Sequence, residues 1–170
     1  MNEGNRGRAL ELALDQRHGF YRSAGMYVES NPRRWKVVGK PDARGFFPAR
    51  PEAQSPPDYT ALANGIAVTF DAKCCADDRW SLGNLKAHQA AAFDAWESNR
   101  GHAAIYLRFT APPMLDVWVP WLELEGRWRR WHAGRAAQGE DSLTRESATA
   151  AGVLVTGLDW LTAVRFWLAR

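Results

Sequence analysis

The chain has 170 residues, of which 46% are hydrophobic and 24% charged, so we expect one globular domain over residues 1–170 and exclude a largely disordered protein. No run of about 18 apolar residues is present and the first residues lack an apolar segment, which predicts neither a membrane span nor a signal peptide. The two cysteines, Cys74 and Cys75, are adjacent and predict no disulfide framework and a cytoplasmic location, and the formal net charge of +3 is compatible with a polyanionic partner.

Periodicity and turn residues predict a mixture of helices and strands. The spacing of Leu10 and Leu14 predicts a helix over residues 6–17, and a short strand over 26–29 should end before Asn31-Pro32. Asn64-Gly65 is the favoured two-residue turn of a β-hairpin and predicts paired strands over 58–62 and 66–73. Further along we expect a loop over 80–84, helices over 85–97, 121–131 and 158–168, and strands over 103–109 and 114–119.

Residues 32–57 form an unusual insert before the hairpin. Between residues 33 and 50 it has six cations and one acid, Asp42. A segment of this length without regular structure is uncommon in a compact domain unless it is functional or a linker. Two interpretations stay open, a solvated loop and a basic arm that lies on phosphates. The prolines are Pro32, Pro41, Pro48, Pro51, Pro56 and Pro57, and the cations are Arg33, Arg34, Lys36, Lys40, Arg44 and Arg50.

The hairpin carries three residues that could perform chemistry, Asp58, Asp71 and Lys73. Side chains alternate along a strand, so Asp71 and Lys73 should project together from the sheet surface while Phe70 and Ala72 face the core. Folding at the hairpin turn can bring Asp58 close to Asp71, and two such carboxylates could bind Mg²⁺. The lysine could orient a water or stabilise charge that develops on a phosphate. The alternative is a turn aspartate beside a solvated ion pair.

Two further polar residues could join this site. Glu11 lies at the edge of the apolar stripe of the first helix, where it is either a third carboxylate of the site or a glutamate at its rim. Gln89 lies at the start of the helix that follows the hairpin and could hydrogen-bond a water or a phosphate, while the neighbouring His88 could be a surface or capping group. The four histidines lack the spacing of a zinc motif.

Cations and aromatic residues are interleaved over residues 127–135. Such a mixture suits contact with a nucleic-acid backbone and stacking on bases. An amphipathic helix whose tryptophans face inward is the other open interpretation. The chain has nine tryptophans in all, which would leave aromatic surface for an interface between subunits. The cations are Arg127, Arg129, Arg130 and Arg135, and the aromatic residues are Trp128, Trp131 and His132.

Several motifs, in this order along most of the chain, resemble RecU-type Holliday junction resolvases, which are PD-(D/E)xK restriction-endonuclease-like nucleases. This chain departs from the family at Asp71, where glutamate is common, and at Cys74-Cys75, which replaces polar residues usual after the lysine. The motifs are Asn5-Arg6-Gly7-x-x-Leu10-Glu11, Pro57-Asp58-Tyr59, Phe70-Asp71-Ala72-Lys73, Ser81-Leu82-x-Asn84-x-x-x-His88-Gln89 and Gly157-Leu158-Asp159-Trp160-Leu161.

The resemblance implies an α/β, restriction-endonuclease-like core in which a central mixed β-sheet is flanked by helices, with residues 32–57 as a protruding basic stalk. It also implies a homodimer that makes symmetric Mg²⁺-dependent nicks in four-way DNA junctions during recombination and repair, with Mn²⁺ as a substitute. A two-fold dimer would supply two identical sites to a substrate of near two-fold symmetry. The implied catalytic residues are Glu11, Asp58, Asp71, Lys73 and Gln89, of which Glu11, Asp58 and Asp71 would hold the metal. The expected DNA-binding residues are Arg33, Arg34, Lys36, Lys40, Arg44, Arg127, Arg129 and Arg130.

Two other functions remain possible at this point. One is a different PD-(D/E)xK nuclease that cuts flaps or duplex ends. The other is a non-catalytic DNA-binding protein that keeps the fold, although the presence of Asp58, Asp71 and Lys73 argues against it.

Overall fold

A computed structural model describes residues 3–32, 34–52 and 55–170, with side chains from residue 7 onward. Its centre is a six-stranded sheet with the strand order β1-β4-β5-β7-β8-β10. β5 and β7 are parallel and the other neighbours are antiparallel, so the sheet is mixed, as predicted. The strands are β1 (Tyr27–Ser30), β4 (Tyr59–Ala63), β5 (Ile66–Cys75), β7 (His102–Phe109), β8 (Leu115–Pro120) and β10 (Val153–Leu154).

Two hydrophobic cores lie on opposite faces of this sheet. Helices α1 (Glu3–Ser23) and α5 (Trp160–Leu168) share the first core with residues such as Phe70 and Tyr106. Helices α2 (Ala87–Ser98), α3 (Trp121–His132) and α4 (Arg145–Ala151) share the second with Ile105 and Leu107. Because adjacent residues of β7 belong to different cores, both faces of the sheet are covered. The predicted α/β architecture is therefore confirmed.

The first helix is longer than predicted at both ends. Leu10, Leu14, His18 and Tyr21 are all buried and lie on one stripe of α1, at the spacing of an amphipathic helix. The predicted helix ends at residue 17. Burial of Tyr21 on the same stripe instead extends it to Ser23. Among the described residues, no helix combines the length and apolarity needed to cross a membrane.

The predicted hairpin is present at β4 and β5. Asn64 and Gly65 have φ angles of 52° and 81°, which are the positive values that the tight turn requires. The register pairs Tyr59 with Phe70 at the open end of the hairpin. This register places Asp58 and Asp71, the next residue on each strand, at the same end.

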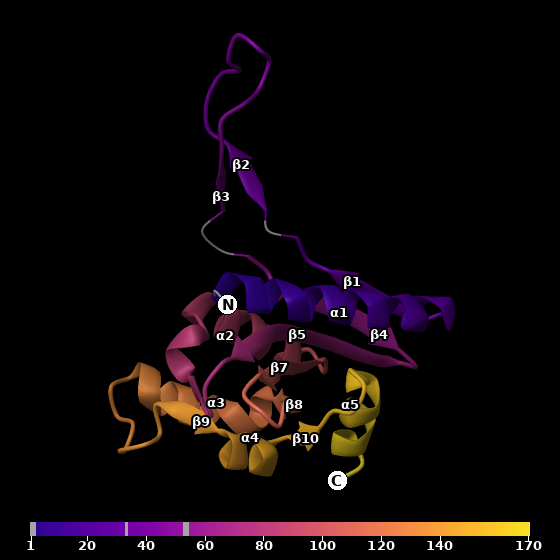
Figure 1. Ribbon diagram of the computed structural model, residues 1–170, viewed down its shortest axis with the longest axis vertical. Coiled ribbons are helices and arrows are strands. Elements are labelled where there is room, and N and C mark those ends of the chain that lie inside the picture. The colour runs from indigo at the N-terminus through magenta and orange to yellow at the C-terminus, as the bar shows by residue number, and fades with distance from the viewer. Residues whose placement is uncertain (1–2, 33, 53–54) are drawn as a thin grey trace.

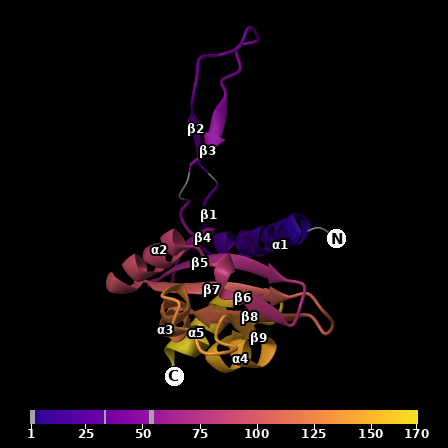
Figure 2. The ribbon, with the colours of Figure 1, turned by 90° about the vertical axis from the view of Figure 1, so that its left-hand side faces the viewer.

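The insert, here called the stalk (residues 32–57), contains a second and smaller hairpin. β2 (Trp35–Val37) pairs with β3 (Ala49–Pro51), and the hairpin projects far from the body of the molecule (Figures 1 and 2). Every residue from 34 to 52 is exposed. The stalk is thus partly regular, and the prediction of a protruding basic arm is confirmed for its described part. Arg33 lies outside the described residues.

The expected loop over residues 80–84 is wrong. Residues Arg79–Ser81 form β6, which pairs with β9 (Ser142–Thr144), and a 3-10 turn η1 (Leu82–Asn84) follows. Ser81 caps this turn by accepting a hydrogen bond from the N–H of Gly83. The strand was missed because its partner is distant in sequence and each strand has three residues.

Candidate active site

Asp58 and Asp71 meet at the open end of the β4–β5 hairpin, as the sequence predicts. The backbone N–H of Asp58 donates to Oδ1 of Asp71 at 2.9 Å. In return, Oδ2 of Asp58 accepts a hydrogen bond from the N–H of Ala72 at 2.9 Å. Each carboxylate is therefore held by main-chain groups, which fixes its orientation without relying on flexible side chains.

Lys73 completes this group. Its Nζ lies 3.2 Å from Oδ2 of Asp71, and the lysine is half-buried. Asp71 is fully buried, so the expectation of a pair standing at the sheet surface is wrong for the aspartate. In the β5–β7 register Asp71 lies beside Ile105, a fully buried residue of the second core, so its side chain is enclosed within the sheet interior. Lys73 thus places an opposite charge beside the buried carboxylate.

The environment opposes the charge on Asp58. Burial and, second, the nearby negative charge of Asp71 raise the pKa of Asp58 to about 6, against a lowering contribution from Lys73. Two carboxylates held this close in a poorly solvated place destabilise each other. A strongly perturbed carboxylate in a cavity is a feature of functional sites.

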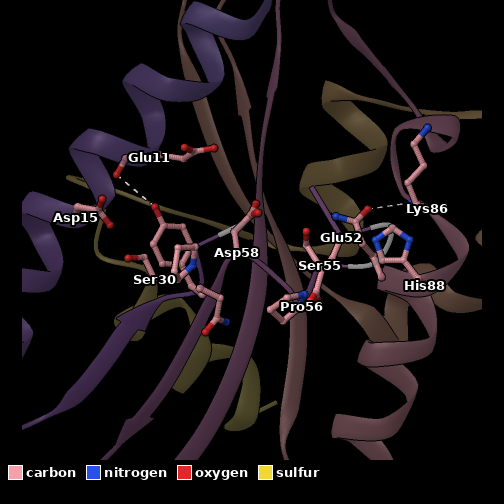
Figure 3. Close-up of a pocket in the computed structure, with 13 residues that line it drawn as sticks. Glu11, Asp15, Ser30, Glu52, Ser55, Pro56, Asp58, Lys86 and His88 are labelled. Carbon is pink, nitrogen blue, oxygen red and sulfur yellow. Dashed lines mark hydrogen bonds between the residues drawn. The ribbon is translucent and has the colours of Figure 1, made fainter. Parts of the chain in front are cut away.

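A cavity of about 530 Å³ opens at Asp58. Asp58 lies between two walls, with Glu11 and Asp15 of α1 on one side and His88 and Lys86 on the other (Figure 3). Gln89 also lines the cavity. Burial and the charge of Asp15 raise the pKa of Glu11, while Lys73 lowers it. The structure thus brings the predicted residues Glu11, Asp58 and Gln89 to one cavity, with Asp71 and Lys73 attached to it through Asp58.

The cavity also contains residues that sequence reasoning missed. Asp15 lies one turn after Glu11 on α1, so the helical spacing of four could have identified it. Lys86 was not predicted because its ammonium donates to the carbonyl of Gly83, a contact made by local chain folding. Gln89 has a structural role as well, since its Oε1 accepts from the N–H of Lys86 and caps α2.

The base of the stalk forms the remaining wall of the cavity. Pro32 on one arm and Glu52, Ser55 and Pro56 on the other line it together with the end of β1. The base of the stalk and Asp58 therefore face the same cavity. Figure 3 shows Ser55 and Pro56 beside Asp58.

The donor set fits a hard divalent cation. Oδ2 of Asp71 is buried and receives no hydrogen bond within the described part of the chain, although Lys73 provides an opposite charge. An unsatisfied buried carboxylate oxygen is costly, and a cation bound there would remove the cost. Asp58 and Asp71 supply oxygen ligands of the kind that Mg²⁺ prefers, and Glu11 lines the same cavity. In the described residues no three histidine, cysteine, aspartate or glutamate side chains converge closely enough to hold a metal alone.

The arginines of α3 are occupied by contacts within the protein. Arg129 pairs with Asp94 and Glu125, and Arg130 pairs with Glu140. Arg127 donates to the carbonyl oxygens of residues 139 and 140. Trp128 is buried, and its indole N–H donates to the carbonyl of residue 85. For this residue the structure therefore shows the second interpretation, an amphipathic helix whose tryptophan faces inward. DNA contact by these arginines stays a prediction.

The tryptophans do not provide the exposed interface surface that their number suggested. Trp80, Trp118, Trp121 and Trp160 are essentially fully buried. Among the nine, Trp35 on the stalk is the one with a largely exposed side chain. Most of the tryptophans therefore pack within the two hydrophobic cores.

The sequence of this chain matches a family model and curated relatives. A family model described as RecU, recombination protein U, matches residues 5–159. Two curated relatives from two strains of Staphylococcus epidermidis, each named Holliday junction resolvase RecU, are 25% identical over 139 residues. This alignment covers 75% of the chain and 64% of each relative, so the chain spans somewhat less than two thirds of their length. A solved structure of Archaeoglobus fulgidus Hjc, titled a Holliday junction resolvase from an archaeal hyperthermophile, has 13% identity and a TM-score of 0.47, covering 88% of this chain and 94% of that one.

Proposed function

This chain belongs to the RecU family, and from that membership and its site we propose that it is a Holliday junction resolvase. In this function it nicks four-way DNA junctions by hydrolysing one phosphodiester in each of two symmetry-related strands. The observation that supports the proposal is the fixed pair Asp58 and Asp71 with Lys73 beside it, at a cavity whose wall is the base of a cationic stalk.

We assign the following roles to the chain's own residues. Asp58 and Asp71 would hold Mg²⁺, for which Mn²⁺ could substitute, with Glu11 as the third carboxylate. Bound Mg²⁺ supplies positive charge that activates the attacking water and stabilises the leaving oxygen. Lys73, anchored by Asp71, places its ammonium where negative charge develops on the phosphate. Gln89, held by the cap of α2, orients the water or a phosphate oxygen with its amide nitrogen.

We also propose that the active form is a homodimer. A four-way junction has near two-fold symmetry, and a two-fold dimer presents two identical sites to it. Paired nicks then follow from the symmetry of the assembly. The stalk cations Arg34, Lys36, Lys40 and Arg44 are exposed and would lie on the junction phosphates.

The decisive experiment compares labelled substrates of the same sequence content. Four-way junction, flap and linear duplex are incubated with the parent protein and Mg²⁺, and with an Asp58→Asn variant as control. We expect paired nicks in the junction alone, and none with the variant. Equal cleavage of the flap would instead indicate a PD-(D/E)xK nuclease of different specificity, and binding of all three without cleavage would indicate a non-catalytic protein.

A further inference from the structure

Asp15 is a carboxylate of the candidate active-site cavity to which the proposed function gives no role. It lies one turn after Glu11 on α1, and both side chains line the cavity. Figure 3 shows them on the same wall, across from Asp58. The negative charge of Asp15 is the second cause, after burial, that raises the pKa of Glu11. The two carboxylates are therefore close enough to act on the same bound ion.

A buried histidine lies behind Asp15. The side chain of His18 is completely buried, and its Nε2 accepts a hydrogen bond from the indole N–H of Trp160 at 3.0 Å. Burial lowers the pKa of His18 to about 4, which keeps the ring neutral near pH 7. A neutral imidazole that accepts at Nε2 carries its proton on Nδ1. The Nδ1–H is thus a donor whose direction is fixed from α5.

This donor points toward Asp15 but does not reach it. Oδ1 of Asp15 lies 3.9 Å from Nδ1 of His18, which is too long for a hydrogen bond. Within the part of the chain that the structure describes, Nδ1 has no other hydrogen-bond acceptor. A buried donor without an acceptor is costly, and the half-exposed Asp15 side chain can rotate to remove this cost.

Tyr59 supplies a second donor at the same place. Its hydroxyl donates to the backbone carbonyl of Glu11 at 3.3 Å, a long and therefore weak hydrogen bond. Burial and, second, the charge of Asp15 raise the pKa of the Tyr59 phenol, so the hydroxyl lies near that carboxylate. The Tyr59 ring packs edge-on against His18, with centroids 4.8 Å apart. Two buried donors from different elements thus approach Asp15.

A carboxylate held in this position can assist a cation without touching it. Mg²⁺ retains several water molecules in protein sites, and residues beyond its direct ligands orient its surroundings. Among the residues that the structure describes, no three acidic, histidine or cysteine side chains converge enough to hold a metal alone. A cation at Asp58 and Asp71 would therefore complete its coordination largely with water, and Asp15 faces the cavity that this water would occupy.

We propose that Asp15 is a positioning residue that strengthens cation binding. Held by the Nδ1–H of His18 and the hydroxyl of Tyr59, its carboxylate accepts hydrogen bonds from water that the cation retains. The inference rests on the proposed function, because it assumes the Mg²⁺ site at Asp58 and Asp71. It adds that the core between α1 and α5 sets the affinity of this site for its cation.

The test measures Mg²⁺ affinity of the full chain by calorimetry, without DNA. Asp15→Asn removes the charge and keeps the size of the side chain. His18→Gln keeps an acceptor for Trp160 but places no N–H at the Nδ1 position, whereas His18→Asn keeps an N–H near that position. Asp77→Asn, at an exposed aspartate, is the control for the loss of one negative charge.

We expect Asp15→Asn to weaken Mg²⁺ binding by about 10- to 100-fold, and His18→Gln to weaken it in the same direction. The double variant should bind no more weakly than Asp15→Asn alone, because His18 acts through Asp15. His18→Asn should recover part of the loss seen in His18→Gln. If the histidine variants do not fold, Tyr59→Phe combined with Asp15→Asn provides the same test, since it keeps the packed ring and removes the hydroxyl.

Parent affinity in Asp15→Asn, additive losses in the double variant, or an equal loss in Asp77→Asn would overturn this role. Complete loss of binding in Asp15→Asn, as expected for Asp71→Asn, would also overturn it, because Asp15 would then be a direct ligand. A parent that cuts junctions while Asp15→Asn keeps its Mg²⁺ affinity would refute this role alone. A parent with the coupled Mg²⁺ binding that does not cut junctions would refute the resolvase proposal and leave the role of Asp15 supported.

Discussion

Asp58 and Asp71 hold each other in place through the main chain. The N–H of Asp58 binds the carboxylate of Asp71, and the N–H that follows Asp71 binds the carboxylate of Asp58, each at 2.9 Å. The pair is thus oriented before any ligand arrives. Burial and, second, the charge of Asp71 raise the pKa of Asp58 to about 6. Keeping both carboxylates charged therefore lowers the stability of the fold while it preserves the geometry of the site.

The first prediction concerns this conflict between activity and stability. Asp58→Asn keeps an oxygen to accept from Ala72 but removes a charge, so it should reduce cleavage by at least about 100-fold while junction binding persists. Its melting temperature at pH 8 should exceed that of the parent, because the repulsion with Asp71 is relieved. Activity assays and calorimetry measure both. Asp77→Asn, at an exposed aspartate, is the control. Parent-like nicking by Asp58→Asn would contradict the assignment.

The second prediction concerns metal binding, which is measured by the melting temperature as well as by cleavage. Excess Mg²⁺ should raise the melting temperature of the parent by roughly 5–10 °C at saturation, because a ligand that binds only the folded state stabilises it. The shift should be absent in Asp58→Asn and in Asp71→Asn. Cleavage should stop in chelator, and Ca²⁺ should allow binding with little cutting. Cleavage at the full rate in excess chelator would disprove the metal requirement.

The hairpin that carries the aspartates could be predicted because its signals are local. Asn64-Gly65 specifies the turn, and strand alternation then fixes which residues meet at the open end. The burial of Asp71 could not be predicted in the same way. It depends on how β5 is packed between its neighbouring strands and under the second core, and the spacing of polar residues in β5 contains no information about that packing.

Other elements were missed because they depend on distant partners. α4 and β10 have seven and two residues, too few for a periodic signal. The Thr144 side chain does cap α4 by accepting from the N–H of Ser147, but this pattern is common outside helices. In the stalk, the prolines and cations predicted projection, whereas the pairing of β2 with β3 was not predicted because each strand has three residues.

The third prediction separates two groups of cations. Arg34, Lys36 and Lys40 of the stalk are exposed and have no ion pair within the described chain, whereas Arg129 and Arg130 are paired with carboxylates. Changing the three stalk cations to alanine should flatten the plot of log affinity against log salt by roughly 0.9 for each lost phosphate contact. It should weaken junction binding more than duplex binding. Arg129→Gln with Arg130→Gln should have the smaller effect, and an equal effect per residue would contradict this ranking.

The fourth prediction concerns assembly. We expect light scattering at micromolar concentration to give about twice the 19.1 kDa of one chain, in the absence of DNA. Stalk variants should keep this mass, because the like charges of two stalks oppose their association. A mass of 19.1 kDa at all concentrations would disprove the dimer.

The fifth prediction uses His18 of α1, whose side chain is completely buried. Its Nε2 accepts a hydrogen bond from the indole of Trp160 in α5 at 3.0 Å. Burial, and to a lesser degree the positive charge of Arg22, lowers the pKa of His18 to about 4 from its ordinary value of 6.5. The unfolded chain therefore takes up the proton first, and stability present above pH 6.5 is lost as the pH falls toward 4.

This loss should be about 3 kcal/mol in the free energy of unfolding. The measurement is urea unfolding at pH 7.5 and pH 4, compared with His18→Gln, which offers an acceptor to the indole but does not titrate. The parent should lose more stability than the variant over this interval, by about that amount. Parallel losses in the two proteins would show that His18 does not titrate as described.

The two ends of the stalk are joined by hydrogen bonds at its base, and this bears on how the stalk can vary in length and sequence. The N–H of Asn31 donates to the carbonyl of Asp58 at 2.7 Å, and its side-chain amide donates to the carbonyl of Pro57 and the hydroxyl of Thr60. The chain thus leaves and re-enters the sheet at one point, and the β1–β4 register does not depend on what lies between. Since the entropy of closing a loop grows slowly with its length, the segment between these ends can be lengthened, shortened or exchanged with little effect on stability. The stalk can therefore vary without refolding the sheet that positions Asp58 and Asp71, and under the proposed function this would let DNA preference diverge separately from cleavage.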